Sequence, residues 1–196
     1  MDAEIVVYEG FDELDAVAPY EVWANACRFA GAGTARLVSL DGTGVHASHG
    51  LRVGVDGRFG ASTPEVVVVP GGGWNARDSP GAWREAEDGR LPDALAGLPE
   101  GTTLASVCTG GMLLATAGLL DGVPATTHHS ALDDLRAYAD AREARVVDAG
   151  DVLTAGGVTS GLDLAFHLVA RAFGDGVAER VAREMEYEPS DDVLVV

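Results

Sequence analysis

Four consecutive valines, Val66–Val69, place the strongest constraint on the fold of this chain. A strand with one face in water alternates apolar and polar residues, whereas a strand buried on both faces is apolar throughout. Such a strand needs a sheet that helices cover on both sides, which is typical of parallel α/β proteins. We therefore expect the valines to form a central strand of a mostly parallel sheet.

Short apolar runs alternate with amphipathic stretches along the whole chain, which favours the same α/β class. No repeat, long linker or change of composition divides the sequence, so we expect one domain over residues 1–196. The pattern predicts strands at residues 4–8, 35–40, 65–69, 103–107 and 152–155. It predicts helices at residues 13–30, 82–96, 109–117, 130–141, 161–173 and 176–186.

Residues 43–55 are expected to form a hairpin or an irregular excursion, and Pro19 leaves open a loop before the first helix. The tail 189–196 is expected to fray or to dock on a partner.

The charge of the chain excludes several classes of partner. Its 31 acidic and 13 basic residues give a formal net charge of −18, and every basic residue is Arg. A surface this negative repels phosphate backbones and anionic lipids, so a small molecule or a second copy of the chain is the expected partner, with no nucleic acid and no membrane. The composition also suits a salt-rich cytoplasm, since salt screens self-repulsion. Greater stability at low salt than at molar salt would contradict that hypothesis.

Neither membrane insertion nor secretion is expected. No run approaches the roughly 18 apolar residues that a spanning helix needs, and the first ten residues lack the basic segment of a signal peptide. We therefore expect a soluble, cytoplasmic protein. Cys27 and Cys108 are the two cysteines, and two alone do not make a secreted disulfide framework. Cys27 is interpreted as helix packing, which leaves Cys108 to be explained.

Cys108 lies where a predicted strand turns directly into a predicted helix. The sequence SVCTGG has the layout of a nucleophile elbow, in which a strained turn holds the reactive side chain above the carboxyl edge of the sheet. Small residues at Gly110 and Gly111 let the turn close. The helix N-terminus favours the thiolate locally, although the negative field of the whole chain opposes it. The alternative interpretation is a buried, inert cysteine.

A glycine-rich loop follows the four valines and reads Pro70, three glycines and Trp74. Glycines let backbone N–H groups approach a ligand closely, as in an oxyanion cradle. The loop is not a phosphate-binding fingerprint, because no Lys follows it and no GxGxxG opens a helix. A plain tight turn is the alternative.

Four motifs, VVVVPGGG, LASVCTGGMLLATAGLLDG, ATTHH and TAGGVTSGLDLAFHLV, resemble the DJ-1/PfpI superfamily. Within it the chain is similar to the branch that includes isocyanide hydratases and the amidotransferase-like domains of some AraC-type regulators. The resemblance covers nearly the whole chain. It implies a single-domain, flavodoxin-like sandwich of the class I glutamine amidotransferase type, with a mostly parallel sheet and helices on both faces. It also implies a homodimer.

The resemblance implies roles for individual residues. Cys108 matches the nucleophile, and Asp15 matches the acidic residue supplied by the loop after the first strand. Beside a cysteine this carboxyl must hold or share a proton, since two anions in contact repel, so Asp15 is expected to act as a proton donor. On the residues alone, a solvated carboxylate at the start of a helix or an N-cap is the favoured interpretation. Gly71, Gly72 and Thr109 are expected to bind substrate, with the N–H groups of Gly72 and Thr109 facing a developing charge.

Thr109 also marks a departure, because protease-like members of the superfamily have His at this position. Without that base, a Cys-His peptidase is not expected. His128 matches a position where a histidine often approaches the cysteine, and it joins Gly157 and Val158 as candidates for lining the site. The pair formed with His129 would suit a metal, but no ligand spacing accompanies it, so no metal and no cofactor are expected.

Three functions stay open on this basis. The first is a hydratase that converts an isocyanide to an N-formamide, with Cys108 attacking the terminal carbon and Asp15 moving the proton. The second is a glyoxalase III-like conversion of methylglyoxal to lactate, in which His128 would matter more. The third is not enzymatic: a redox or stress sensor that oxidises Cys108, or a ligand-binding protein. No helix-turn-helix pattern follows Phe173, so direct DNA binding is not expected.

Overall fold

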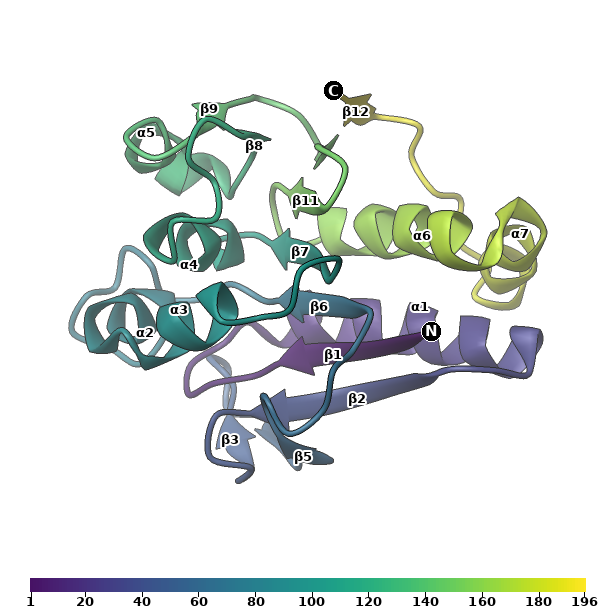
Figure 1. The fold of residues 1–196 in the computed structure, drawn as a ribbon, viewed down its shortest axis with the longest axis horizontal. Coiled ribbons are helices and arrows are strands. Elements are labelled where there is room, and N and C mark those ends of the chain that lie inside the picture. The colour runs from purple at the N-terminus through teal and green to yellow at the C-terminus, as the bar shows by residue number, and fades with distance from the viewer.

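The fold is built on one eight-stranded sheet, seen in a computed structural model that describes all residues 1–196 (Figure 1). Its strand order is β12-β10-β11-β7-β6-β1-β2-β5, and every neighbouring pair is parallel except β10 with β11. The strands of this sheet are β1 (Asp2–Val6), β2 (Thr34–Ser39), β5 (Gly57–Arg58), β6 (Val66–Val69), β7 (Thr103–Val107), β10 (Val146–Asp148), β11 (Val152–Ala155) and β12 (Val193–Val195). Two small sheets pair β3 (Val45–His46) with β4 (Arg52–Val53), and β8 (Pro124–Ala125) with β9 (Asp140–Ala141).

Two groups of helices cover the sheet. One group packs α1 (Glu13–Ala30), α6 (Ser160–Phe173) and α7 (Asp175–Glu184) together, and the other packs α2 (Ala82–Asp88), α3 (Arg90–Ala96) and α4 (Gly110–Thr116). Figure 1 shows the strands between the two groups. A 3₁₀ turn, η1 (His129–Ala131), leads into the one-turn helix α5 (Leu132–Leu135). None of these helices combines the length and the apolar character needed to cross a membrane.

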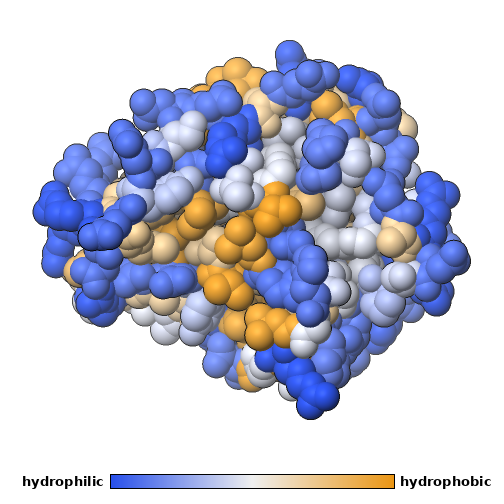
Figure 2. All heavy atoms as spheres, turned by 180° about the vertical axis from the view of Figure 1, so that it is seen from behind, coloured by the Kyte–Doolittle hydropathy of each residue, from blue (hydrophilic) through white to orange (hydrophobic).

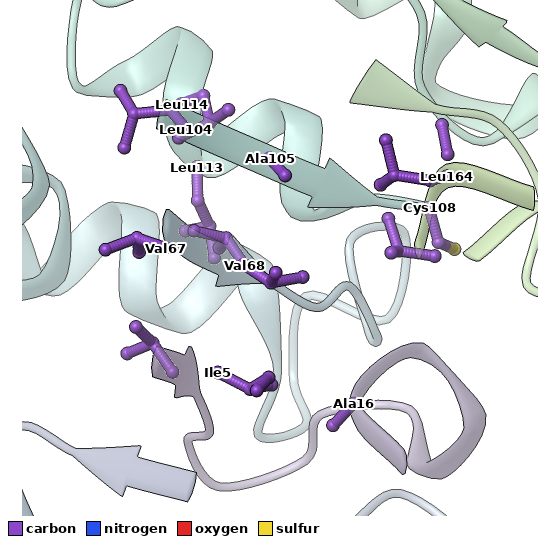
Figure 3. Close-up of a cluster of buried hydrophobic side chains, with 14 of the residues drawn as sticks. Ile5, Ala16, Val67, Val68, Leu104, Ala105, Cys108, Leu113, Leu114 and Leu164 are labelled. Carbon is purple, nitrogen blue, oxygen red and sulfur yellow. The ribbon is translucent and has the colours of Figure 1, made fainter. Parts of the chain in front are cut away.

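The four valines behave as their pattern predicts. All four are buried in β6, which pairs with β1 on one side and β7 on the other. Figure 3 shows the cluster that this placement creates, with side chains from the three strands packed against α1, α4 and α6. Cys108 lies at its edge, directly after β7. Full burial of one such side chain stabilises the fold by about 1.5–3 kcal/mol relative to leaving it in water.

Several predicted elements match the structure, and two differ in an instructive way. The first helix spans residues 13–30 without a break, so a loop ahead of it is the wrong alternative, although Pro19 lies inside the helix. The predicted helix 82–96 is instead two helices, because Gly89 adopts φ 78° between them. The hairpin expected in residues 43–55 is confirmed as β3 and β4.

The helix predicted over residues 130–141 is wrong beyond its first turns. Leu135 is the last buried side chain of the segment, and the residues that follow are exposed up to β9, apart from the half-buried Ala139. A helix there would have no apolar face to bury, and most helical stability comes from such packing. The short strands β5, β10 and β12 are also absent from the sequence prediction.

The C-terminal tail forms an edge strand of the sheet. Val193–Val195 pairs in parallel with β10. The buried carboxyl of Asp163 holds the segment before it, accepting hydrogen bonds from the Tyr187 hydroxyl (3.0 Å) and the Ser190 N–H (2.8 Å). The tail therefore docks on its own sheet.

Candidate active site

The central predicted site residues follow three neighbouring strands. Asp15 follows β1 on the first turn of α1, Gly71 and Gly72 follow β6, and Cys108 follows β7. Since these strands are adjacent and parallel, their carboxyl ends meet at one edge of the sheet, where ligands bind in open α/β folds. The fold thus brings together residues that lie far apart in the sequence.

The backbone at Cys108 has the strain of a nucleophile elbow. Its φ is 56°, and Glu186 is the only other non-glycine residue with positive φ. Such a conformation costs about 1–3 kcal/mol and persists where surrounding contacts impose it. Here the Cys108 N–H donates to the Ala155 carbonyl (3.1 Å), and the Thr127 hydroxyl donates to the Cys108 carbonyl (2.8 Å). A Cβ at Gly110 would collide with the Val69 carbonyl oxygen, so the turn requires glycine there.

Asp15 is a buried carboxyl held by the glycine loop. It has no exposed surface, and its Oδ2 accepts the Gly71 N–H at 3.0 Å. Burial, reinforced by the charge of Asp12, raises the pKa of Asp15 from 3.8 to about 8. The group is therefore protonated at neutral pH, in agreement with the requirement inferred from the sequence.

Cys108 does not show the thiolate preference expected of a helix N-terminus. Its side chain is only 6% exposed, and burial together with the charge of Asp15 raises the pKa of the thiol well above its usual range. The Thr109 N–H acts in the opposite direction but is outweighed. The resting state at neutral pH is thus a neutral thiol beside a neutral carboxyl.

The thiol and the carboxyl are direct neighbours. A hydrogen-bonding interaction between them contributes to the pKa of both groups. Asp15 Oδ1 nevertheless has no partner of ordinary hydrogen-bond geometry. The pair is therefore a close contact without a well-formed bond at Oδ1, and a small movement would let the proton pass between the two groups.

The glycine loop differs from the predicted oxyanion cradle. The Gly72 N–H donates to the Thr109 hydroxyl (2.9 Å), and the Gly71 N–H is taken by Asp15. Neither amide is free to face a substrate in this state. The Thr109 N–H instead interacts with the Cys108 thiol, and the Thr109 hydroxyl, having accepted from Gly72, still has its own hydrogen to donate.

Replacing Thr109 with valine is expected to lower the free energy of unfolding by about 1–3 kcal/mol, because the part-buried Gly72 N–H loses its acceptor. Thr109→Ser keeps the hydroxyl and serves as the control. Urea denaturation of the three proteins provides the measurement. Equal stability of the valine and serine variants would show that the Gly72 bond contributes nothing.

The remaining predicted residues follow two segments that bond to the elbow through Thr127 and Ala155, and they do not bond to it themselves. The His128 Nδ1 pairs with the Ser130 hydroxyl (2.8 Å), and its ring packs on His129 with centroids 4.1 Å apart. Burial lowers the pKa of His128, so its ring is neutral at pH 7. Gly157 faces the His128 ring, and the half-buried Val158 packs against the core. No hydrogen bond joins any of them to Cys108 or Asp15.

Two site residues were absent from the sequence prediction. The Tyr8 hydroxyl is buried and donates to the Pro70 carbonyl (2.8 Å), and burial raises the pKa of Tyr8 well above its usual value, with the charges of Asp15 and Cys108 adding to the effect. Asp12 is the N-cap of α1, and its N–H donates to the Gly71 carbonyl (2.7 Å). The signal available was an Asp directly before a predicted helix, which is an N-cap pattern.

One cluster near Asp15 has the composition of a metal site. Ligand atoms of Asp12, Glu13 and His49 lie within 4.8 Å of one another. The Glu13 carboxylate already accepts hydrogen bonds from the Ser48 hydroxyl and from His49. These bonds outweigh the effect of burial and lower the pKa of Glu13 to about 2. The cluster thus links the β3–β4 hairpin to the start of α1 by its own hydrogen bonds.

Comparisons with known proteins find relatives that match most of this chain. Residues 1–171 match the sequence profile of the DJ-1/PfpI family. An isonitrile hydratase from Pseudomonas putida is 32% identical over 190 residues, which are 94% of this chain and 78% of that protein. The HTH-type transcriptional regulator CdhR from Pseudomonas aeruginosa is 30% identical over 192 residues, which are 93% of this chain and 54% of the regulator. The crystal structure of a THiJ/PfpI family protein from Pseudomonas syringae superimposes with a TM-score of 0.86 at 29% identity, covering 96% of this chain and 76% of that one.

Proposed function

The chain belongs to the DJ-1/PfpI family, and from that premise we propose that it is a cysteine-dependent hydratase that converts a small isocyanide to an N-formamide. The observation that carries the proposal is the buried, protonated Asp15 beside the elbow cysteine. A carboxyl in that state can exchange a proton with the sulfur and with a substrate carbon. The similarity to an isonitrile hydratase supports the choice of substrate, since isonitrile and isocyanide are two names for one functional group.

The proposed reaction has two balanced steps. In the first, the Cys108 sulfur bonds to the terminal carbon of R–N≡C, and the thiol proton reaches the same carbon through the Asp15 carboxyl, which gives R–N=CH–S–Cys. In the second, water adds to this carbon and one of its protons goes to the nitrogen. The other water proton passes through the Asp15 carboxyl to the sulfur as the carbon–sulfur bond breaks. The products are R–NH–CHO and the free thiol. No electron acceptor and no cofactor enter the balance.

Thr109 is the proposed contact for charge that develops on the adduct. Its N–H lowers the pKa of the Cys108 thiol, and its hydroxyl hydrogen is free to turn toward a substrate nitrogen. The Gly72 N–H could bind the adduct only after giving up its hydrogen bond to the Thr109 hydroxyl. Gly71 contributes by positioning the Asp15 carboxyl. In this proposal His128, Gly157 and Val158 line the approach and do not carry protons.

The geometry gives less support to the alternatives. A glyoxalase-like reaction would draw on His128, whose Nδ1 is engaged with Ser130. A peroxide sensor needs an exposed thiolate, whereas Cys108 is buried and its pKa is raised. A ligand-binding role has a specific argument in its favour, because regulators such as CdhR match the chain over about half of their own length.

The test is an assay of purified protein with an alkyl and an aryl isocyanide, followed by chromatographic detection of the formamide. Methylglyoxal with detection of lactate runs in parallel. Catalytic formation of formamide without lactate is the expected result. Binding of isocyanide without turnover would overturn the hydratase proposal and favour the ligand-binding role.

We also propose that the protein is a homodimer. Leu14 and Val17 are exposed hydrophobic residues on the helix that carries Asp15. Figure 2 shows a band of hydrophobic side chains across the face seen from behind, bordered by hydrophilic ones. Light scattering coupled to size-exclusion chromatography gives the mass, and a value near 20 kDa at micromolar concentration would contradict a dimer.

A further inference from the structure

A small polar cavity lies beside Glu4, away from the candidate active site. It opens between the start of β1, the start of β2 and the segment that leads into β6, and Figure 1 shows the chain beginning there at β1, beside β2. The cavity has a volume of about 40 Å³, which is roughly three times the 10–15 Å³ that one water needs. Apart from Pro64, every lining residue has a polar side chain: Asp2, Glu4, Thr34, Arg36, Ser62 and Thr63.

Glu4 is an unusual residue for the middle of a parallel sheet. Its strand pairs on both sides, and the residue is only 1% exposed. The Ser62 hydroxyl donates to Oε1, and the nearest guanidinium nitrogen of Arg36 is 3.8 Å from that same oxygen. Oε2 is buried and has no hydrogen-bond partner among the protein atoms. A buried carboxylate oxygen without a partner is costly, so this atom requires a ligand.

The lining specifies the chemical class of that ligand. Besides Glu4, it offers the carboxylate of Asp2 and the hydroxyls of Thr34, Ser62 and Thr63, which are all hard oxygen donors. Thr34 donates to the Asp2 carboxylate (2.9 Å), which orients that group at the rim. With the carboxylates of Asp2 and Glu4 and the guanidinium of Arg36, the lining has a net charge of −1. One monovalent metal ion would neutralise that charge, whereas divalent sites such as those for Ca²⁺ draw on more carboxylates.

We propose that this cavity binds a monovalent metal cation, Na⁺ or K⁺, with Glu4 Oε2 as its principal ligand. The hydroxyls of Ser62 and Thr63 and the Asp2 carboxylate supply further oxygen ligands. The ion joins β1 to the segment before β6, which the backbone bond from the Glu65 N–H to the Asp2 carbonyl (3.0 Å) already holds nearby. Because an ion that binds only the folded state stabilises it, the protein responds to the identity of the cation as well as to ionic strength.

The test compares thermal unfolding in NaCl, KCl and choline chloride at equal ionic strength. Choline screens charge but is too large for the cavity. We expect Na⁺ or K⁺ to raise the unfolding midpoint by about 2–4 °C relative to choline. A weakly bound ion that stabilises a domain of this size only slightly would produce a shift of this order. Glu4→Gln, which keeps the shape of the side chain, should abolish the difference. Glu179→Gln removes one exposed charge elsewhere and should leave the difference intact.

The remaining outcomes are also decisive. Identical midpoints in the three salts would overturn the proposal and would mean that a water completes Glu4. A cation-specific difference that survives in Glu4→Gln would place the ion elsewhere and overturn it equally. If Glu4→Gln does not fold, Ser62→Ala tests the same site from an exposed residue, and it should raise the cation concentration needed for half of the shift by at least about threefold. An unchanged concentration in that variant would reject Ser62 as a ligand and with it the proposed site.

Discussion

Replacing Cys108 with alanine should reduce isocyanide turnover by on the order of 10³-fold or more, because the proposed covalent step has no other nucleophile. Alanine is smaller than the buried thiol, and a positive φ costs it about as much as it costs cysteine, so the fold should persist. Initial rates of formamide formation measure the effect. Circular dichroism of the variant checks that the loss is chemical.

The chain provides a matched control in its other cysteine. Cys27 lies in α1, partly buried against the core and away from the elbow. Cys27→Ala should therefore keep turnover within about a factor of two, as expected for a packing position outside the site. Turnover that survives in Cys108→Ala, or is lost equally in both variants, would remove Cys108 from the reaction.

Replacing Asp15 with asparagine should reduce the same rate by about 10²–10⁴-fold, the usual contribution of one positioned proton donor. Asparagine retains the shape and an oxygen that can accept the Gly71 N–H, but it cannot carry a proton. Asp12→Asn is the companion variant. This variant removes the charge that helps raise the pKa of Asp15 but leaves the proton carrier in place, so activity should persist. Because the pKa of Asp15 falls, the loss of activity on the alkaline side of the pH–rate profile should begin at a lower pH. Similar losses in both variants would contradict the assignment of Asp15 as the proton carrier.

The raised pKa of Asp15 also predicts how stability depends on pH. The pKa is 3.8 in its unperturbed state and about 8 in the fold, so between these values the folded protein holds a proton that the unfolded chain has released. Stability then falls as pH rises through this window, by about 1.4 kcal/mol per pH unit from this group. Asp15→Asn lacks the effect. The difference in unfolding free energy between variant and wild type should therefore grow from pH 5 to pH 8, and parallel denaturation curves would contradict the assignment.

The parts of the fold that the sequence predicts well are those in which a local pattern and the tertiary structure agree. Val66–Val69 has no polar face, so a central strand was the remaining choice, and the strand, cysteine and glycines around Cys108 fit one kind of turn. The strands β10 and β12 escape prediction because each has three residues, and their pairing depends on contacts across the sheet edge. The helix proposed for residues 130–141 failed because local propensity does not reveal where burial stops.

The site shows the same division between local and long-range information. Cys108 is indicated by its strand–turn–helix motif, whereas Asp15 is indicated only by the family resemblance, and the expected proton on Asp15 follows from two acidic groups in contact. The neutral state of the thiol depends on how deeply the elbow is buried, which no spacing records. The bond between the Gly72 N–H and the Thr109 hydroxyl joins residues 37 positions apart and alters the predicted cradle.

Gly71 holds the parts of the site together without a side chain of its own. Its N–H binds the Asp15 carboxyl, its carbonyl accepts the Asp12 N–H, and the place where a Cβ would lie is occupied by the Thr109 backbone. The backbone of Gly71 therefore sets the distance between the Asp15 carboxyl and the Cys108 thiol. A redesign that moved only the Cys108 and Asp15 side chains to another scaffold would keep the reactive groups but lose the glycine backbone that positions them.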